Sequence, residues 1–400
     1  MFSFTLEIGA GDGPRLGRLE TDHGTVETPL FMPVGTQGAV KALSSEDLLR
    51  LRVGMILANT YHLYLRPGHK VIEKLGGLHR FMGWPGPMLT DSGGYQVLSL
   101  GALREISEEG VLFRSHLDGG PHMLTPEDVV RIQAALGSDI GMVLDECIGF
   151  PSPYGEAREA MERTLRWAKR SLEVVREEVP LTLFAIVQGG VFPDLRRACA
   201  EALCGVGFPG YAIGGLGVGE TKERTFEMVE TVTSILPPSS PRYLMGMGTP
   251  LDLVEAVARG VDMFDCVLPT RNGRNGTLFT RFGKLQIRNS RYAEDDGPID
   301  SACGCYTCRN YSRAYLRHLF LSRELSAYRL NSIHNVHFYQ DLMENMRRAI
   351  RAGTFDDFRC KFVEDFEASE QQDEPGALGV EGMKRDGGFW QDLDIKRAEG

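Results

Sequence analysis

The chain has 400 residues, of which 42% are hydrophobic, and its formal net charge of −10 argues against indiscriminate binding to nucleic acid. It contains no apolar run of about 18 residues, which excludes a membrane-spanning helix, and its N-terminus lacks the basic start and apolar stretch of a signal peptide. We therefore expect a cytoplasmic protein with reduced thiols.

Short apolar segments alternate with longer amphipathic ones over most of the chain. Several apolar segments are continuous runs, as expected for strands that are covered on both faces. The predicted strands are Pro29–Val34, Met55–Asn59, Met88–Asp91, Ile140–Asp145, Leu183–Gln188, Tyr211–Leu216, Tyr243–Gly248 and Val261–Val267. The predicted helices are one that starts after Thr125, and Glu156–Glu178, Pro193–Cys204, Lys222–Ile235, Pro250–Arg259 and Asn335–Arg351. This alternation predicts a (β/α)8 TIM barrel, with a doubly wound open sheet as the alternative.

Carboxylates follow several predicted strands, at the end where such a barrel places its active site. Asp91 and Asp265 each come directly after an apolar run. Two carboxylates can divide the work of breaking a glycosidic bond, one as nucleophile and the other as general acid and base. A helix cap or a salt bridge explains either aspartate alone, but explains the two together less well. The pair therefore predicts chemistry at a glycosidic bond.

A second set of residues suits the recognition of a guanine-like edge. Asp145 can accept hydrogen bonds from N–H groups, and the amide of Gln188 can donate to a carbonyl. Gly215 and Leu216 would add backbone groups where no side chain blocks the approach of a base. Two further side chains could hold a planar ring by stacking and sulfur contact, although packing inside the barrel is their simpler explanation. These two residues are Tyr95 and Met245.

A basic segment follows the last predicted strand. Residues 268–276 are glycine-rich and basic, and we expect a loop there. Residues 270–350 hold 13 basic and seven acidic side chains, whereas residues 351–400 hold seven and 13. A basic segment in an acidic protein predicts an oriented anionic partner, although a solvated surface of mixed charge explains it equally well.

Three cysteines lie within six residues, and a histidine follows the last of them after 26 positions; the four are Cys303, Cys305, Cys308 and His334. Three thiolates and one imidazole form a closed tetrahedral set for Zn²⁺, so such a metal would be structural and the chemistry would occur elsewhere. His337 is near enough to leave the fourth ligand open, and a chance cluster of reduced thiols is the alternative.

Longer motifs accompany these residues. They are LTDSGGYQ at 89–96, VLDEC at 143–147, IVQGG at 186–190, GGLGVGE at 214–220, LMGMGTP at 244–250, FDCVLPTR at 264–271 and CGCYTC at 303–308. With them, the chain resembles the tRNA-guanine transglycosylases of the bacterial type over about residues 1–365. These enzymes exchange a genetically encoded guanine in tRNA for a deazaguanine.

The resemblance implies a catalytic cycle. Asp265 would attack the anomeric carbon and form a covalent tRNA–enzyme intermediate, and Asp91 would act as general acid and base. Guanine at the wobble position of G-U-N anticodons would leave, and 7-aminomethyl-7-deazaguanine would replace it in a ping-pong reaction of queuosine biosynthesis. The tRNAs would be those for aspartate, asparagine, histidine and tyrosine. Two inversions would retain the stereochemistry at the ribose.

The resemblance also assigns the base pocket. Asp145, Gln188 and the backbone of Gly215 would hold the edge of the base, and the carbonyl of Leu216 would accept from its aminomethyl group. The remaining pocket residues are Tyr95 and Met245, which would stack against the base, and Ser92 and Gly93, which would line the same strand end.

Further implications concern the partners. Arg271, Asn272 and Arg274 would grip the anticodon, and one structural zinc ion per subunit would hold together a subdomain that docks the RNA. Members of this family form homodimers. Three residues with the spacing of one helix face are the candidate contact, with core packing as an equal alternative. They are Tyr311, Tyr315 and His318.

We expect three parts of the chain. They are the main part of the barrel with the catalytic site (1–268), the basic loop with the zinc-binding subdomain (269–350), and a C-terminal helix with a loosely ordered acidic tail (351–400).

Cys147 and Val218 match bacterial members of the family, and the β-branched Val218 should narrow the pocket against the larger base queuine. We therefore expect 7-aminomethyl-7-deazaguanine as substrate, with a queuine-using transglycosylase as one alternative. A non-catalytic tRNA-binding zinc subunit is another, but it would be expected to lack the two catalytic aspartates.

Overall fold

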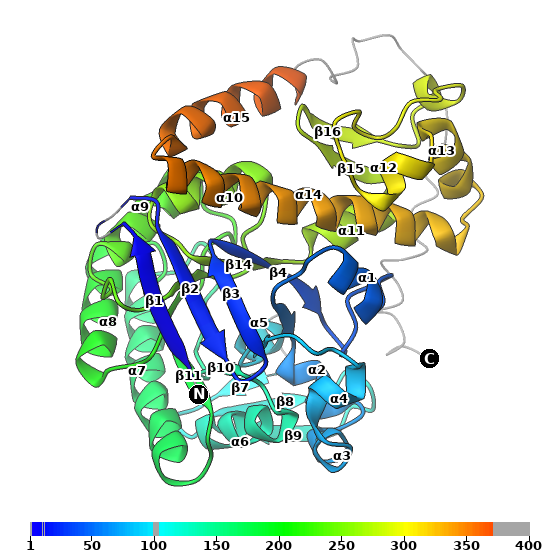
Figure 1. Ribbon diagram of the computed structural model, residues 1–400. Coiled ribbons are helices and arrows are strands. Elements are labelled where there is room, and N and C mark those ends of the chain that lie inside the picture. Colours follow the sequence, from blue (N-terminus) through cyan, green and yellow to red (C-terminus); the bar gives the residue numbers. More distant parts are fainter. Residues whose placement is uncertain (1, 10, 12, 99–103, 371–400) are drawn as a thin grey trace.

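Eight parallel strands close into a barrel in the computed structural model, which describes residues 2–9, 11, 13–98 and 104–370 (Figure 1). Around the barrel the strands are β4 (Leu30–Gly35), β5 (Ile56–Ala58), β6 (Met88–Thr90), β10 (Ile140–Met142), β11 (Thr182–Val187), β12 (Tyr211–Ile213), β13 (Arg242–Leu244) and β14 (Met263–Cys266). Pairing of β14 with β4 and of β10 with β6 leaves no open edge. The predicted TIM barrel is confirmed, and the open doubly wound sheet is excluded.

Helices follow the strands as expected. They are α6 (Pro126–Leu136), α7 (Tyr154–Glu177), α8 (Pro193–Val206), α9 (Lys222–Thr233) and α10 (Pro250–Ala258). Thr125 caps α6, because its hydroxyl accepts from the N–H of Asp128 at 3.1 Å while the Asp128 carboxylate binds back to Thr125. Within the described part of the chain, no helix is both long and apolar enough to cross a membrane.

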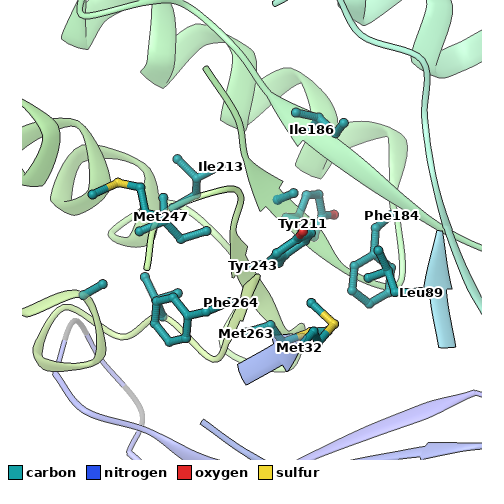
Figure 2. Close-up of a cluster of buried hydrophobic side chains, with 14 of the residues drawn as sticks. Met32, Leu89, Phe184, Ile186, Tyr211, Ile213, Tyr243, Met247, Met263 and Phe264 are labelled. Atoms are coloured by element: carbon teal, nitrogen blue, oxygen red, sulfur yellow. The ribbon is translucent and has the colours of Figure 1, made fainter. Parts of the chain in front are cut away.

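Side chains from different strands fill the interior of the barrel. Met32 of β4, Phe184 of β11, Tyr243 of β13 and Met263 of β14 belong to one cluster of buried residues (Figure 2). Each of these four side chains is at most 1% exposed. A filled interior cannot admit a substrate, so any site must lie at the mouth of the barrel.

Several small elements were not predicted. An antiparallel sheet of β1 (Ser3–Ile8), β2 (Leu16–Thr21) and β3 (Gly24–Thr28) precedes the barrel, and a second sheet of β7 (Arg104–Ile106), β8 (Val111–Arg114) and β9 (Pro121–Leu124) follows β6. Short helices lie between the first barrel strands: α1 (Ser45–Arg50), α2 (Thr60–Leu65), α3 (His69–Lys74), α4 (Gly77–Met82) and α5 (Gly94–Leu98). Arg15, beside the first sheet, lies 3.3 Å from Asp262 immediately before β14, so this sheet packs at the N-terminal end of the barrel.

The predicted loop at 268–276 is wrong, because Leu268–Asn275 forms a helix, α11. Pro269 lies in its first turn, and Gly276 ends it with a φ of +80°. Gly273 lies so close to the long helix α14 (Leu325–Ala352) that a Cβ would come 3.0 Å from the backbone nitrogen of Ser332. The small residues that suggest a loop therefore allow two helices to pack closely.

A small subdomain separates the last barrel strand from α14 (Figure 1). It contains β15 (Thr277–Thr280), β16 (Gly283–Gln286), a 3₁₀ turn (Ser290–Tyr292), α12 (Tyr306–Asn310) and α13 (Arg313–Leu321). Helix α14 begins at Leu325 rather than at the predicted Asn335, and α15 (Phe355–Glu370) follows it. The predicted acidic tail after residue 370 lies outside the described residues.

The single helix face predicted for Tyr311, Tyr315 and His318 is also wrong. Tyr311 ends α12, and Ser312 caps a new helix by accepting from the N–H of Tyr315 at 3.2 Å. The Tyr311 and Tyr315 rings nevertheless stack with centroids 5.5 Å apart, and Tyr315 is 45% exposed.

Candidate active site

Four predicted site residues lie at the carboxyl ends of barrel strands. Asp91 follows β6, Asp145 follows β10, Gln188 follows β11, and Asp265 lies near the end of β14. Because parallel strands of a closed barrel end at the same rim, their side chains share one face of the molecule. The site predicted from the sequence is thus assembled from four separate strands.

Asp91 is buried and accepts hydrogen bonds from three groups. The N–H of Thr60 donates to Oδ1 at 2.9 Å, while the side-chain amides of Asn59 and Gln96 donate to Oδ2, the latter at 2.8 Å. Burial nevertheless outweighs these donors and, with the nearby charge of Asp265, raises the pKa of Asp91 to about 6. A carboxyl with this pKa can both give and take a proton near neutral pH.

Asp265 is held through only one of its oxygens. The hydroxyl of Tyr243 donates to Oδ1 at 2.5 Å, and the N–H of Gly246 donates to the same atom at 2.8 Å. Within the described residues, Oδ2 accepts no hydrogen bond. Desolvation raises the pKa of Asp265, and its two donors act in the opposite direction. The arrangement fixes the carboxylate while leaving one oxygen available for attack.

Asp145 and Gln188 form a buried polar pair. The Gln188 amide donates to Asp145 Oδ2 at 2.7 Å, and the hydroxyl of Ser92 donates to Oδ1 at 3.1 Å. Gln188 Oε1 is buried without a hydrogen-bond partner in the described residues. A Cβ at Gly215 would come 2.5 Å from this oxygen, and Gly215 has a φ of +65°, so glycine is required there. An unpaired acceptor beside bare backbone suits a planar ligand with N–H groups.

The remaining predicted pocket residues surround this pair at the rim. Ser92 and Leu216 are buried, and Gly93 has a φ of +84°. Tyr95, in α5, is 59% exposed, whereas Met245, just after β13, is half-buried. The stacking of these last two side chains against a base stays a prediction.

Sequence reasoning missed the groups that orient the two candidate catalytic carboxylates. Asn59, Thr60 and Gln96 bind Asp91, and Tyr243 binds Asp265. A polar hydroxyl within the apolar run of β13 was the available signal for Tyr243, since a buried phenol needs a hydrogen-bond partner.

The predicted RNA-contacting residues lie on α11, which begins two residues after β14 ends. Arg271 is exposed, whereas Asn272 and Arg274 are half-buried. This helix therefore places an exposed cation close to the rim that carries Asp265.

The cysteines and the histidine converge as predicted. Nδ1 of His334 lies 3.8, 3.6 and 3.3 Å from the sulfur atoms of Cys303, Cys305 and Cys308, respectively. Ligands of a tetrahedral zinc ion lie about 3.6 Å apart, so the four atoms fit this metal. Nε2 of His334 lies 2.7 Å from the carbonyl of Phe279, a contact that leaves Nδ1 for coordination. Of the two candidate histidines, His334 completes the compact four-ligand set.

Comparisons with known proteins agree with this geometry. The sequence model of a family described as "Queuine tRNA-ribosyltransferase" matches residues 11–368. A queuine tRNA-ribosyltransferase of Caldanaerobacter subterraneus subsp. tengcongensis is 56% identical over 358 residues, which cover 90% of this chain and 96% of the relative. The protein of that name from Syntrophobacter fumaroxidans is 58% identical over 361 residues, which cover 90% of this chain and 96% of that relative. The one from Moorella thermoacetica is 54% identical over 365 residues, which cover 91% of this chain and 98% of that relative. The chain therefore belongs to the queuine tRNA-ribosyltransferase family.

Proposed function

We propose that this protein exchanges guanine at the wobble position of G-U-N anticodons for 7-aminomethyl-7-deazaguanine. Membership of the family supports the coarser statement, a tRNA-ribosyltransferase, which is a pentosyltransferase of the tRNA-guanine transglycosylase type. The observation that carries the mechanism is the pair of carboxylates at one barrel rim, Asp265 with one uncommitted oxygen and Asp91 with a pKa of about 6.

In the proposed cycle, Oδ2 of Asp265 attacks the anomeric carbon of the target nucleotide as the bond to guanine breaks. Asp91 gives a proton to the departing guanine and later takes one from the incoming base. That base then attacks the same carbon and releases Asp265. Both displacements invert the centre, so the product keeps the original configuration.

The base pocket follows from the same rim. Asp145 would accept from the N–H groups of the base edge, and Gln188 and Gly215 would complete the polar contacts. Burial raises the pKa of Asp145, so its charge is costly without donors. Ser92 and Gln188 supply such donors in the free protein, and the bound base would supplement or replace them.

The basic test is incorporation of labelled guanine into unmodified tRNA with a G-U-N anticodon. Wild-type protein should transfer the label, and competition with 7-aminomethyl-7-deazaguanine should suppress it. Absence of transfer by folded, zinc-loaded protein would contradict the proposal and favour a non-catalytic tRNA-binding subunit.

The two half-reactions should have opposite pH dependence. The acid form of Asp91 is needed when guanine leaves, so formation of the covalent intermediate should slow as pH rises above about 6. The ionised form is needed when the new base enters, so capture of that base should slow about tenfold per pH unit below about 6. Single-turnover rates measured separately for the two steps test this prediction. Asp91→Asn should abolish the pH dependence of both steps. Parallel pH profiles for the two steps in wild-type protein would contradict the prediction.

Val218 bears on the choice between the two deazaguanines. It is half-buried and lines a narrow pocket with Gly190, Phe192 and Gly215, next to the proposed base edge. Val218→Gly should raise the rate for queuine relative to 7-aminomethyl-7-deazaguanine by about tenfold or more, because it removes a side chain that fills the pocket. Competition between the two labelled bases measures this ratio. An unchanged ratio would remove Val218 from the specificity pocket.

In this proposal residues 1–268 perform the chemistry, and residues 269–350 contact the anticodon through Arg271, Asn272 and Arg274. One structural Zn²⁺ per subunit, bound by the Cys₃His set, would hold the second part together. The expected compartment is the cytoplasm, where thiolates stay reduced.

We further propose a homodimer that uses a cluster of three tyrosines, in which Tyr306 of α12 and Tyr315 of α13 are exposed and Tyr311 between the two helices is half-buried. The hydroxyls of Tyr306 and Tyr311 lie 3.2 Å apart, and the Tyr311 ring stacks on Tyr315. Tyr315→Ala should weaken dimerisation by at least about tenfold, since a buried aromatic anchor dominates many interfaces. Sedimentation equilibrium measures the effect. A dimer of unchanged affinity and intact fold would place the interface elsewhere.

A further inference from the structure

A fully buried arginine lies behind the proposed base pocket. Arg196 is in the first turns of α8, the helix that follows β11, and its exposed fraction is 0%. Among the described residues, its guanidinium forms no ion pair with a carboxylate. A buried charge without a counterion is costly unless other polar groups surround it. The charge of Arg196 therefore depends on the hydrogen bonds that it donates.

Each nitrogen of this guanidinium donates to a backbone carbonyl. Nε donates to Gly190 at 2.8 Å, Nη1 to Val187 at 2.9 Å, and Nη2 to Gly215 at 3.4 Å. Val187 ends β11, and Gly215 comes two residues after the end of β12. Because the guanidinium is planar and rigid, it fixes the three acceptors relative to one another. One side chain thus ties together the carboxyl ends of two neighbouring strands.

The first of these strand ends carries Gln188. The carbonyl of Val187, directly before it, accepts from Arg196 and also from the N–H of Gly214 at 3.1 Å. The N–H of Gln188 donates to the sulfur of Cys199 at 3.4 Å, about one turn further along α8. Side chains of α8 therefore hold the backbone on both sides of the Gln188 side chain.

The second strand end carries the backbone groups of the proposed pocket. The carbonyl that Arg196 binds belongs to the peptide between Gly215 and Leu216. In the proposed pocket, the N–H of Gly215 and the carbonyl of Leu216 would contact the base from the two sides of this peptide. A peptide is planar, so a hydrogen bond to its oxygen restricts the rotation of both groups. Glycine needs such a restraint more than other residues, because its backbone is the most mobile.

The candidate catalytic carboxylates are held by other groups. Their donors are Asn59, Thr60 and Gln96 for Asp91, and Tyr243 and Gly246 for Asp265. In the described structure none of these donors bonds to Arg196. Loss of the guanidinium should therefore affect binding of the base without affecting the chemistry.

We propose that Arg196 is a positioning residue for base recognition, whose guanidinium holds the backbone at Gly190 and Gly215 in the conformation that accepts the entering base. This inference rests on the proposed function and deepens it, since Arg196 acts through the backbone of the pocket. Burial lowers the pKa of Arg196 to about 10, so the side chain still carries its charge at neutral pH.

Steady-state exchange with labelled 7-aminomethyl-7-deazaguanine and saturating G-U-N tRNA tests the proposal. Arg196→Met keeps a long unbranched side chain and removes every donor. The KM for the base should rise by at least about tenfold, while kcat at saturating base should stay within about threefold of wild type. The matched control is Arg197→Met, which changes the adjacent but exposed arginine of the same helix. It should keep the wild-type KM.

Arg196→Lys provides a second, more conservative variant. Lysine keeps the charge but lacks the planar fork, so it cannot bind all three carbonyls at once. Its KM for the base should lie between those of wild type and Arg196→Met, at least about threefold above wild type. This variant decides the question if Arg196→Met does not fold.

Hydrogen exchange tests the positioning role without any activity measurement. Amides of residues 188–190 and 214–217 should exchange faster in Arg196→Met than in wild type, while the other barrel strands stay protected. Arg197→Met should exchange as wild type does.

Two results would overturn the proposal. One is a wild-type KM for the base in a folded Arg196→Met or Arg196→Lys protein. The other is a lower kcat with unchanged KM and faster exchange throughout the barrel, which would give Arg196 a general structural role. Failure of the proposed function looks different, because wild type itself would then exchange no guanine, and this inference would fall with it.

Discussion

Asp265→Asn should lower guanine exchange by at least about 10³-fold, because the substituted amide cannot form the covalent bond to ribose. Asn is nearly isosteric and keeps the side-chain oxygen that accepts from Tyr243 and Gly246, so the fold should survive. Labelled guanine entering tRNA measures the rate, and a denaturing gel shows whether wild type alone forms a covalent tRNA adduct. Zinc content and melting temperature verify that the variant is folded.

Tyr243→Phe is the matched comparison for this variant. It preserves the buried ring and removes only the hydroxyl that donates to Asp265 Oδ1. Since that donor lowers the pKa of Asp265, its loss should raise this pKa further. The exchange rate should then begin to fall at a higher pH when the solution is acidified. Activity should fall far less than in Asp265→Asn. A covalent adduct in Asp265→Asn would assign the nucleophile to another residue, and Asp91 would be the first to examine.

The positions of the barrel strands could be predicted because each strand is a run of apolar residues that are adjacent in the sequence. Continuous apolar runs recur through residues 29–267, and each observed strand lies within one or two residues of its predicted start. The helix α11 could not be predicted, because the interactions that hold it come from a distant part of the chain. Asn331 and Asn335 of α14 donate to the carbonyls of Gly273 and Pro269 at 3.1 and 3.0 Å. Glycine-rich composition alone favours a loop there.

The candidate site, like the fold, could be predicted only in part from the sequence. Its carboxylates stand at strand ends, where alternation of strand and helix makes them conspicuous. Their pKa values depend on desolvation and on donors such as Asn59 and Tyr243, which reach them only through the closed barrel.

Cys308→Ala should have the largest effect on stability, because the subdomain it belongs to has little else to hold it. The hydrophobic core of this subdomain is separate from that of the barrel and consists mainly of nine buried residues, among them Leu278, Tyr292 and Leu316. A core of this size seldom sustains a fold alone, and structural zinc contributes about 10 kcal/mol of apparent binding free energy in small domains. Loss of one thiolate should therefore unfold the subdomain while the barrel remains.

The expected signature of Cys308→Ala is an early melting transition, with fast hydrogen exchange over residues 277–321 and slow exchange in the barrel strands. Cobalt-loaded protein should lose its thiolate charge-transfer band, and tRNA binding should weaken. Cys360→Ala is the matched control, since Cys360 is exposed on α15 and outside the metal set, and it should behave as wild type. A Cys308→Ala protein that retains the thiolate band and a single late transition would show that the three cysteines do not form a metal site. The subdomain would then have to be held by its contact with α14, through residues such as Asn335, whose carboxamide oxygen accepts from the N–H of Phe279 at 3.0 Å.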